Sequence, residues 1–139
     1  MKLGNRSLSN LKGVHPNLIH VLMEAIRDTP ADFTIVAGVR TALEQDALYA
    51  QGRTRPGQIV TQKDGVRNKS NHQVKADGFG YAVDLYPYVN GKVDVQNESK
   101  KLDDIAAHIL ATAKRLGVSI VWGGNWATFK DYPHFELIL

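Results

Sequence analysis

The chain has 139 residues, of which 43% are hydrophobic and 22% charged, and its formal net charge is +3. This size and composition predict a single folded domain over residues 1–139. Cysteine is absent, which excludes disulfides, cysteine nucleophiles and thiolate metal ligands. No apolar run of signal-peptide or membrane-spanning length occurs, so a soluble protein without a Sec-type signal peptide is expected.

Two helices and an intervening strand are predicted in the first part of the chain. Apolar residues recur at helical spacing over residues 16–29, which indicates an amphipathic helix. Residues 33–37 form a short, β-rich apolar run that predicts a strand. Thr41 and Glu44 match a capping box that opens a second helix, and Gly52 is a plausible end for that helix.

A polar stretch over residues 53–70 shows no periodicity. An unstructured loop of this length in a compact domain is often functional, so the segment could be a lid or a rim. Basic side chains are frequent here and just beyond, which fits either a solvated loop or the steering of an anionic substrate. The basic residues concerned are Arg53, Arg55, Lys63, Arg67, Lys69 and Lys75.

The second half of the chain predicts mainly strands. Residues 81–86 indicate a strand, and Asn90-Gly91 between two short β-rich runs predicts a two-residue hairpin turn. Apolar residues on one helical face indicate a long helix, with Ser99 as its N-cap and Gly117 just beyond its end. Two final strands are expected over residues 118–122 and 134–138.

The order of these elements favours an α+β fold. The helices come early and late, whereas the strands cluster in the second half and are joined by short turns. We therefore predict a single domain with a mainly antiparallel sheet packed with about three helices.

Two of the five histidines are candidates for a metal site. His72 and Asp84 flank a turn-rich segment, residues 75–80, that could fold the chain back and bring their side chains together. In antiparallel pairing they face each other only across a bulge or a loop with an odd number of residues, so a three-residue or bulged turn is expected. The other histidines, His15, His20 and His108, are expected at the surface or its boundary.

The second candidate histidine, His134, begins the last predicted strand and follows Asp131 in the pattern Asp-x-x-His. Two imidazoles and one carboxylate are a common catalytic zinc set that leaves the fourth position to water. A nearby carboxylate that does not bind the metal can then take the proton of that water. Glu136 shares the strand face of His134, so it either supports a ligand or faces solvent.

Three motifs resemble those of a known family. They are Ser70-Asn-His72, Gly80-Tyr-Ala-Val-Asp84 and Asp131-Tyr-Pro-His134. They are similar to motifs of the D-alanyl-D-alanine carboxypeptidase and VanY-like metallopeptidases, which share a fold with hedgehog signalling domains. The resemblance is greatest to phage endolysins that are L-alanyl-D-glutamate peptidases. It also covers residues 33–41, 87–92 and 134–137, and so spans most of the chain in order.

The resemblance implies a hedgehog-like peptidase fold with one zinc ion per chain, bound by His72, Asp84 and His134. It further implies that Asp131 is the general base and that Arg40 holds the substrate or the oxyanion. Simpler interpretations are a turn residue for Asp131 and a structural salt bridge for Arg40. Relatives usually have a shorter interval between the first histidine and the aspartate; ligation by His72 is still expected, because loop insertions are usually tolerated.

The implied function is a zinc-dependent peptidoglycan endopeptidase that cuts the L-alanyl-D-glutamate bond of the stem peptide. The alternatives are a D-alanyl-D-alanine carboxypeptidase and a non-catalytic cell-wall-binding module of the same fold. An endolysin without a signal peptide would stay in the host bacterial cytoplasm until a holin releases it to the cell wall. We expect a monomer that neither inserts into membranes nor binds nucleic acid, because no clustered basic face with a reading element is found.

Overall fold

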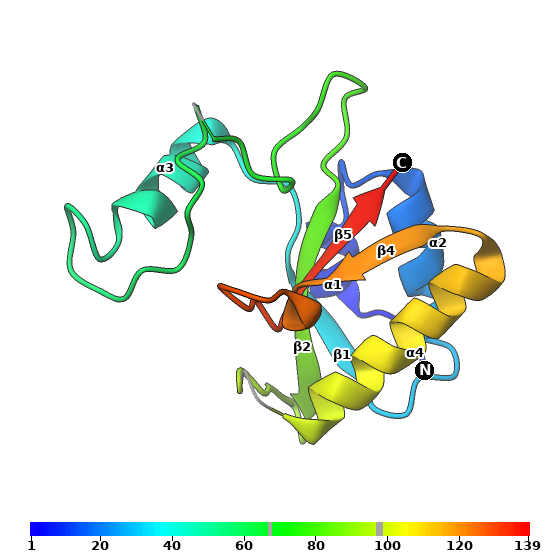
Figure 1. Ribbon diagram of the computed structural model, residues 1–139. Coiled ribbons are helices and arrows are strands. Elements are labelled where there is room, and N and C mark those ends of the chain that lie inside the picture. Colours follow the sequence, from blue (N-terminus) through cyan, green and yellow to red (C-terminus); the bar gives the residue numbers. More distant parts are fainter. Residues whose placement is uncertain (67, 97–98) are drawn as a thin grey trace.

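A five-stranded antiparallel sheet is the framework of the computed structural model, which describes residues 1–66, 68–96 and 99–139 (Figure 1). Its strands run in the order β1-β2-β5-β4, and β3 pairs with β2 off this path. Their bounds are β1 Phe33–Ala37, β2 Ala82–Val89, β3 Lys92–Val93, β4 Ser119–Trp122 and β5 His134–Ile138. Arg67 of the predicted basic segment lies outside the described residues.

Two helices cover one face of the sheet and close the core. The helix α2 packs on α4 and β5, and α4 also packs on β4 and β2 (Figure 1). The helices are α1 Asn5–Asn10, α2 Pro16–Ala25, α3 Ala42–Ala50 and α4 Lys100–Leu116, with the short 3-10 helix η1 Gly123–Asn125 after β4. Among the described residues, none of the helices combines the length and the apolar character needed to cross a membrane.

Strand alternation separates the core from the opposite face of the sheet. Val83 and Leu85 of β2 point into the core and are fully buried, as is Phe135 of β5. Successive side chains of a strand point to opposite faces, so Asp84 and His134 lie on the other face. The two central strands therefore carry apolar side chains toward the helices and polar side chains away from them.

The predicted α+β class and antiparallel sheet are confirmed. Several local signals also hold: Thr41 and Glu44 form both hydrogen bonds of the capping box, and Ser99 caps α4 by accepting from Leu102 N. Asn90 and Gly91 both have positive φ and form the predicted hairpin turn between β2 and β3.

Among the described residues the structure has four α-helices, one more than the three located from the sequence. The additional helix, α1, has only six residues and is too short to show a periodicity. It packs along β1, where Ser7 Oγ accepts from Ile35 N at 3.0 Å and Asn10 Nδ2 donates to Ile35 O at 2.8 Å. These bonds cover backbone groups of an edge strand that would otherwise be open to pairing with another chain.

The hairpin proposed for His72 and Asp84 was wrong in its pairing. The chain does reverse through a three-residue turn, in which Lys75 N donates to Phe79 O. His72, however, lies in a turn rather than a strand, and the cross-strand partners of Asp84 are Ala37 and His134. The strand β2 is paired by segments distant in sequence, which local turn signals cannot reveal.

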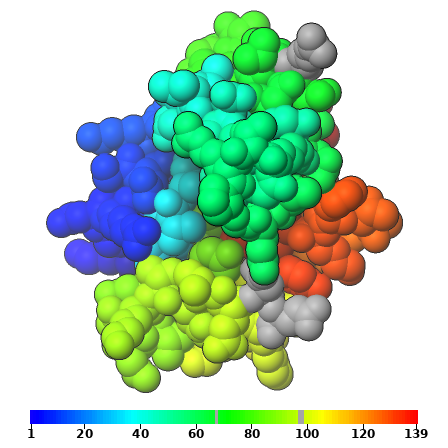
Figure 2. All heavy atoms as spheres, turned by 90° about the vertical axis from the view of Figure 1, so that its left-hand side faces the viewer, coloured from blue at the N-terminus to red at the C-terminus, as the bar shows by residue number. Residues whose placement is uncertain are grey.

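The helix α3 and the loop after it form a lobe, defined here as residues 42–66, that lies to one side of the sheet (Figure 1). Viewed from that side, its cyan and green atoms occupy the centre of the molecular face (Figure 2). The described part of residues 53–70 contains no helix, and its ordered contacts include an isolated bridge between Gln51 and Arg55. The lobe is therefore attached beside the core rather than built into it.

Replacement of Gly38 by alanine is expected to destabilise the fold. A Cβ atom at Gly38 would overlap the backbone oxygen of Asn10, so α1 would have to move away from β1. Overpacking of this kind costs about 1–3 kcal/mol in the free energy of unfolding, which urea denaturation would measure. Gly4→Ala is the matched control, because a Cβ there meets nothing within 4 Å. Equal stability of the two variants would contradict this packing argument.

Candidate metal centre

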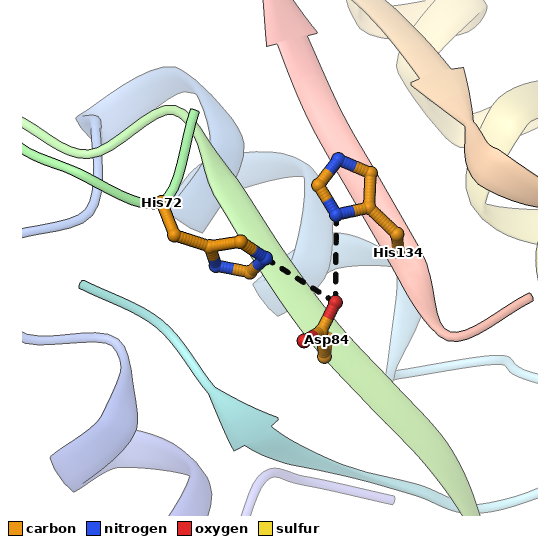
Figure 3. Close-up of side chains that lie close together, drawn as sticks. All are labelled: His72, Asp84 and His134. Atoms are coloured by element: carbon orange, nitrogen blue, oxygen red, sulfur yellow. Dashed lines mark ion pairs between the residues drawn. The ribbon is translucent and has the colours of Figure 1, made fainter. Parts of the chain in front are cut away.

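Three side chains converge on the face of the sheet opposite the core helices (Figure 3). Asp84 comes from β2, and His134 is its direct partner on β5. His72 comes from the turn that precedes β2, so its imidazole reaches the carboxylate from a different segment (Figure 3). The structure thus brings together the three residues that the sequence predicted as metal ligands.

Two of the distances within this cluster match those between the ligand atoms of a tetrahedral ion. Asp84 Oδ1 lies 3.3 Å from His72 Nε2 and 3.5 Å from His134 Nδ1. The three candidate ligand atoms all lie within 4.8 Å of one another. Two atoms that each bind a tetrahedral ion at about 2.0–2.2 Å are separated by about 3.3–3.6 Å. Little rearrangement would be needed for the three atoms to share one ion.

The same three atoms are buried without a hydrogen-bond partner. They are His72 Nε2, Asp84 Oδ1 and His134 Nδ1. An unsatisfied buried polar atom costs about 1–3 kcal/mol, and three that point at one another are not explained by packing alone. A divalent cation would satisfy all three atoms together, so the residues present fit a metal ion.

Each imidazole is oriented by the nitrogen that faces away from the cluster. His72 Nδ1 donates to Gly38 O at 2.9 Å, which leaves the lone pair of Nε2 toward Asp84. His134 Nε2 donates to Glu136 Oε1 at 2.7 Å, which leaves Nδ1 toward Asp84. Metal-binding histidines almost always have such a partner on the second nitrogen. The two histidines therefore present different nitrogens to the same point.

Glu136 is a partner of His134, which confirms the first of the two interpretations open for it. It lies directly across from Ala82 on the site face, and its Oε2 accepts from Asn71 Nδ2 at 2.7 Å. Asn71 precedes His72, so one residue links the turn that carries His72 to the strand that carries His134. Sequence reasoning gave Asn71 no role, because a hydrogen bond between distant segments leaves no local signal.

Arg40 also reaches the site, through Asp84. Its guanidinium Nη2 lies 2.7 Å from Asp84 Oδ2, the carboxylate oxygen that does not face the imidazoles. Its backbone N–H donates to His72 O at 2.9 Å, so the residue is tied to two of the candidate ligands. The salt bridge that was the simpler interpretation of Arg40 is therefore present. Its side chain is 19% exposed, so it also reaches the surface of the site.

Asp131 lies beside the cluster without joining it. Its Oδ2 is 3.9 Å from His134 Nδ1, and its side chain is 41% exposed. Its backbone is held by a bond from Asp131 N to Gly123 O, and its own carbonyl accepts from His134 N. Burial raises the pKa of Asp131, and the negative charge of Asp84 raises it further. This placement suits a carboxylate that handles protons rather than one that binds a metal.

The charges of the cluster are strongly coupled. Burial would raise the pKa of Asp84, but the two imidazoles and Arg40 outweigh it and hold that pKa well below its usual range. Burial would lower the pKa of His134, but Asp84 and Glu136 more than offset it and raise the pKa to about 9. In the metal-free protein His134 is therefore protonated at neutral pH, so binding of a metal must release that proton.

The two tryptophans near the site differ in their surroundings. The Trp122 ring stacks on Phe135 with centroids 6.3 Å apart and belongs to the core side. The Trp126 ring lies 5.0 Å from the ring of His134. Of these two rings, that of Trp126 is thus the one that contacts a candidate ligand.

The fold is similar to that of two solved peptidases. The chain is similar to the L-Ala D-Glu endopeptidase ChiX of Serratia marcescens, with a TM-score of 0.76 and 29% identity over 99% of this chain and 90% of that one. It shares its fold with the vancomycin-resistance D,D-dipeptidase VanXYg, with a TM-score of 0.56 and 18% identity over 89% of this chain and 50% of that one.

Sequence relatives define the family. The peptidoglycan L-alanyl-D-glutamate endopeptidase CwlK of Bacillus subtilis is 37% identical over 123 residues, which are 84% of this chain and 67% of CwlK. The L-alanyl-D-glutamate peptidase of Escherichia phage T5 is 32% identical over 136 residues, 98% of this chain and 88% of that protein. The sequence model of the phage L-alanyl-D-glutamate peptidase family matches residues 1–138. The chain belongs to this family, which confirms the resemblance seen in its motifs.

Replacement of Glu136 by glutamine is expected to weaken metal binding by about 10–100-fold, because His134 loses its charged partner. Titration with Co²⁺, followed by its visible absorption, would measure the dissociation constant. Glu24→Gln on α2 is the matched control, since Glu24 forms its ion pair among the described residues with the exposed Arg27. An unchanged dissociation constant in Glu136→Gln would show that this carboxylate does not support the site.

Proposed function

We propose that this chain is a zinc-dependent peptidoglycan endopeptidase that hydrolyses the L-alanyl-D-glutamate bond of the stem peptide. The observation that carries the proposal is the convergence of three buried candidate ligand atoms that have no hydrogen-bond partner among the described residues. Membership of a peptidase family, with relatives named for this bond, supplies the substrate class.

His72 Nε2, Asp84 Oδ1 and His134 Nδ1 would hold the zinc ion. Two nitrogens and one carboxylate oxygen, without cysteine, are a donor set of catalytic zinc sites, in which a fourth position stays open. When bound, zinc polarises the scissile carbonyl and lowers the pKa of water. The protein contributes the fixed imidazole orientations and the burial of the cluster.

Asp131 is proposed as the general base. It accepts a proton from the attacking water and then returns the proton to the leaving amine. Its position supports this role, because Oδ2 lies 3.9 Å from His134 Nδ1 while the side chain remains partly exposed to an incoming peptide. The backbone bond from Asp131 N to Gly123 O anchors the segment from which this short side chain extends.

Arg40 is proposed to hold the substrate or the tetrahedral oxyanion. Asp84 and Gln45 engage two of the five N–H donors of its guanidinium. The remaining donors, next to the carboxylate of a candidate ligand, are suitably placed for an oxygen that gains negative charge. The same ion pair keeps Asp84 Oδ1 turned toward the imidazoles, so Arg40 serves both the ligand and the reaction.

The setting of the reaction belongs to the same proposal. The chain would act as a monomer on the cell wall, after a holin releases it from the cytoplasm of the host bacterium. It would need neither a nucleic-acid partner nor insertion into a membrane. Cleavage at a chain end, as in a D-alanyl-D-alanine carboxypeptidase, is the competing outcome of the experiment below; the likeness to VanXYg concerns the fold alone.

Digestion of purified peptidoglycan should release peptides with a new amino group on D-glutamate, detected by mass spectrometry. Release of free D-alanine would instead identify a carboxypeptidase, and binding without any product would identify a non-catalytic module. Treatment with a chelator should abolish cleavage, and added zinc should restore it, because the buried cluster loses its ion and regains it. Cleavage that persists without metal would contradict the proposed zinc dependence.

Asp131→Asn and His72→Ala should separate proton transfer from metal binding. The first variant should keep about one zinc per chain and lose about 10²–10⁴-fold in kcat, because its amide cannot accept a proton. The second should lose most of the zinc, since one of three ligands is gone. Metal analysis and peptide-cleavage kinetics measure the two effects. Normal turnover by Asp131→Asn would exclude its role as base, and full zinc content in His72→Ala would remove His72 from the site.

A further inference from the structure

We propose that Gln45 is a positioning residue that holds Arg40 against Asp84 and ties this pair to the lobe. This inference rests on the proposed function, because it assigns Gln45 a part in that site. It starts from the composition of α3, whose buried side chain is a polar amide: Gln45 has a relative exposure of 0%. A helix usually docks through apolar side chains, so the burial of an amide calls for a specific reason.

The amide of Gln45 is bonded on both sides. Its Oε1 accepts from Arg40 NH1 at 3.2 Å. Its Nε2 donates to Thr61 Oγ1 at 3.1 Å and to Lys63 O at 2.8 Å. Because Arg40 NH2 lies 2.7 Å from Asp84 Oδ2, a continuous chain of polar contacts runs from the loop of the lobe to a candidate metal ligand.

This arrangement requires an amide. The side toward Arg40 needs an acceptor, whereas the side toward the loop needs two N–H donors, and only a carboxamide offers both. Leucine would leave an Arg40 N–H and the Lys63 carbonyl without their partner. Glutamate would keep the acceptor for Arg40 but would lose both donors to the loop. Leucine therefore removes the contacts with both Arg40 and the loop, whereas glutamate removes only the contacts with the loop.

A second buried glutamine, Gln73, holds the same loop. Gln73, which follows His72, donates from Nε2 to Gly65 O at 2.9 Å. Gly65 has φ +90, and a Cβ there would crowd Ala42 O and the Gln45 side chain, so the loop lies directly against α3 at this point. The lobe is thus fastened beside both Arg40 and His72. The sequence left two roles open for residues 53–70, a lid or a rim. These contacts favour the rim.

The test compares Gln45→Leu, Gln45→Glu and Gln51→Leu in the zinc-loaded protein. Gln51 is the matched control, because it is a glutamine of the same lobe that donates to a loop carbonyl, Gln58 O, and does not touch Arg40. We would measure kcat and KM with a stem peptide, zinc content, hydrogen exchange of residues 61–66, and the NMR signal of the Arg40 Nε–H.

Gln45→Leu is expected to lower kcat about 10–100-fold with its zinc retained, since a loosely held Arg40 no longer meets the reacting group correctly. Its Arg40 signal should broaden, and exchange of residues 61–66 should accelerate. Gln45→Glu should keep kcat within about threefold and a sharp Arg40 signal, yet show the faster loop exchange and a raised KM. Gln51→Leu should match the native protein in kcat and in the Arg40 signal.

Native kcat and a native Arg40 signal in Gln45→Leu would overturn the proposal, and so would a Gln45→Glu variant as impaired in kcat as Gln45→Leu. If Gln45→Leu fails to fold, Gln45→Glu decides alone, because unchanged exchange of residues 61–66 would disprove the link to the lobe. The exchange and NMR measurements do not depend on turnover. Failure of the native protein to cleave the peptide would therefore count against the proposed function and leave the test of Gln45 intact.

Discussion

The pairing register of β2 with β5 is the constraint on which the site depends. It sets Asp84 directly across from His134 and Ala82 across from Glu136, so that a ligand pair and its supporting carboxylate share one face. The same register sends Val83 and Phe135 into the core. A slip by one residue would exchange the two faces, burying charged groups under the helices and exposing the core. The burial of the core residues and the pairing of Asp84 with His134 therefore depend on one set of backbone hydrogen bonds.

Each candidate ligand is also held from behind by a different kind of group. A backbone carbonyl orients His72, a carboxylate orients His134, and a guanidinium holds the free oxygen of Asp84. Two of these partners, Gly38 and Arg40, come from the connection between β1 and α3, and the third, Glu136, comes from β5. Such supports keep the three candidate ligand atoms close together. The arrangement is preorganised by the whole fold rather than by one local motif.

Sequence could predict what is encoded locally. The capping box at Thr41, the turn at Asn90-Gly91 and the cap at Ser99 depend on neighbouring residues, and the structure contains all three. The three candidate ligands were found through motifs that resemble a family, and the structure brings them together. The way in which the chain brings these three residues together was not predictable, because β2 pairs with strands distant in sequence. The role of Gln45 was not predictable for a related reason: an amide between two acidic residues of a helix is expected at the surface until its distant partners are known.

The residues between His72 and Asp84 show how a long interval can be accommodated beside a candidate ligand. Part of this interval forms a closed turn: Lys75 N donates to Phe79 O, and Tyr81 OH donates to Asp77. The turn also packs on the start of α2, where the His15 ring lies 5.4 Å from that of Phe79. At the base of this loop, which contains His72, Tyr81 N donates to Asn71 O at 2.8 Å. The residues that follow His72 lie within this closed loop. The position of His72 is therefore set by its contacts with Gly38 and Arg40, and not by the number of residues that follow it.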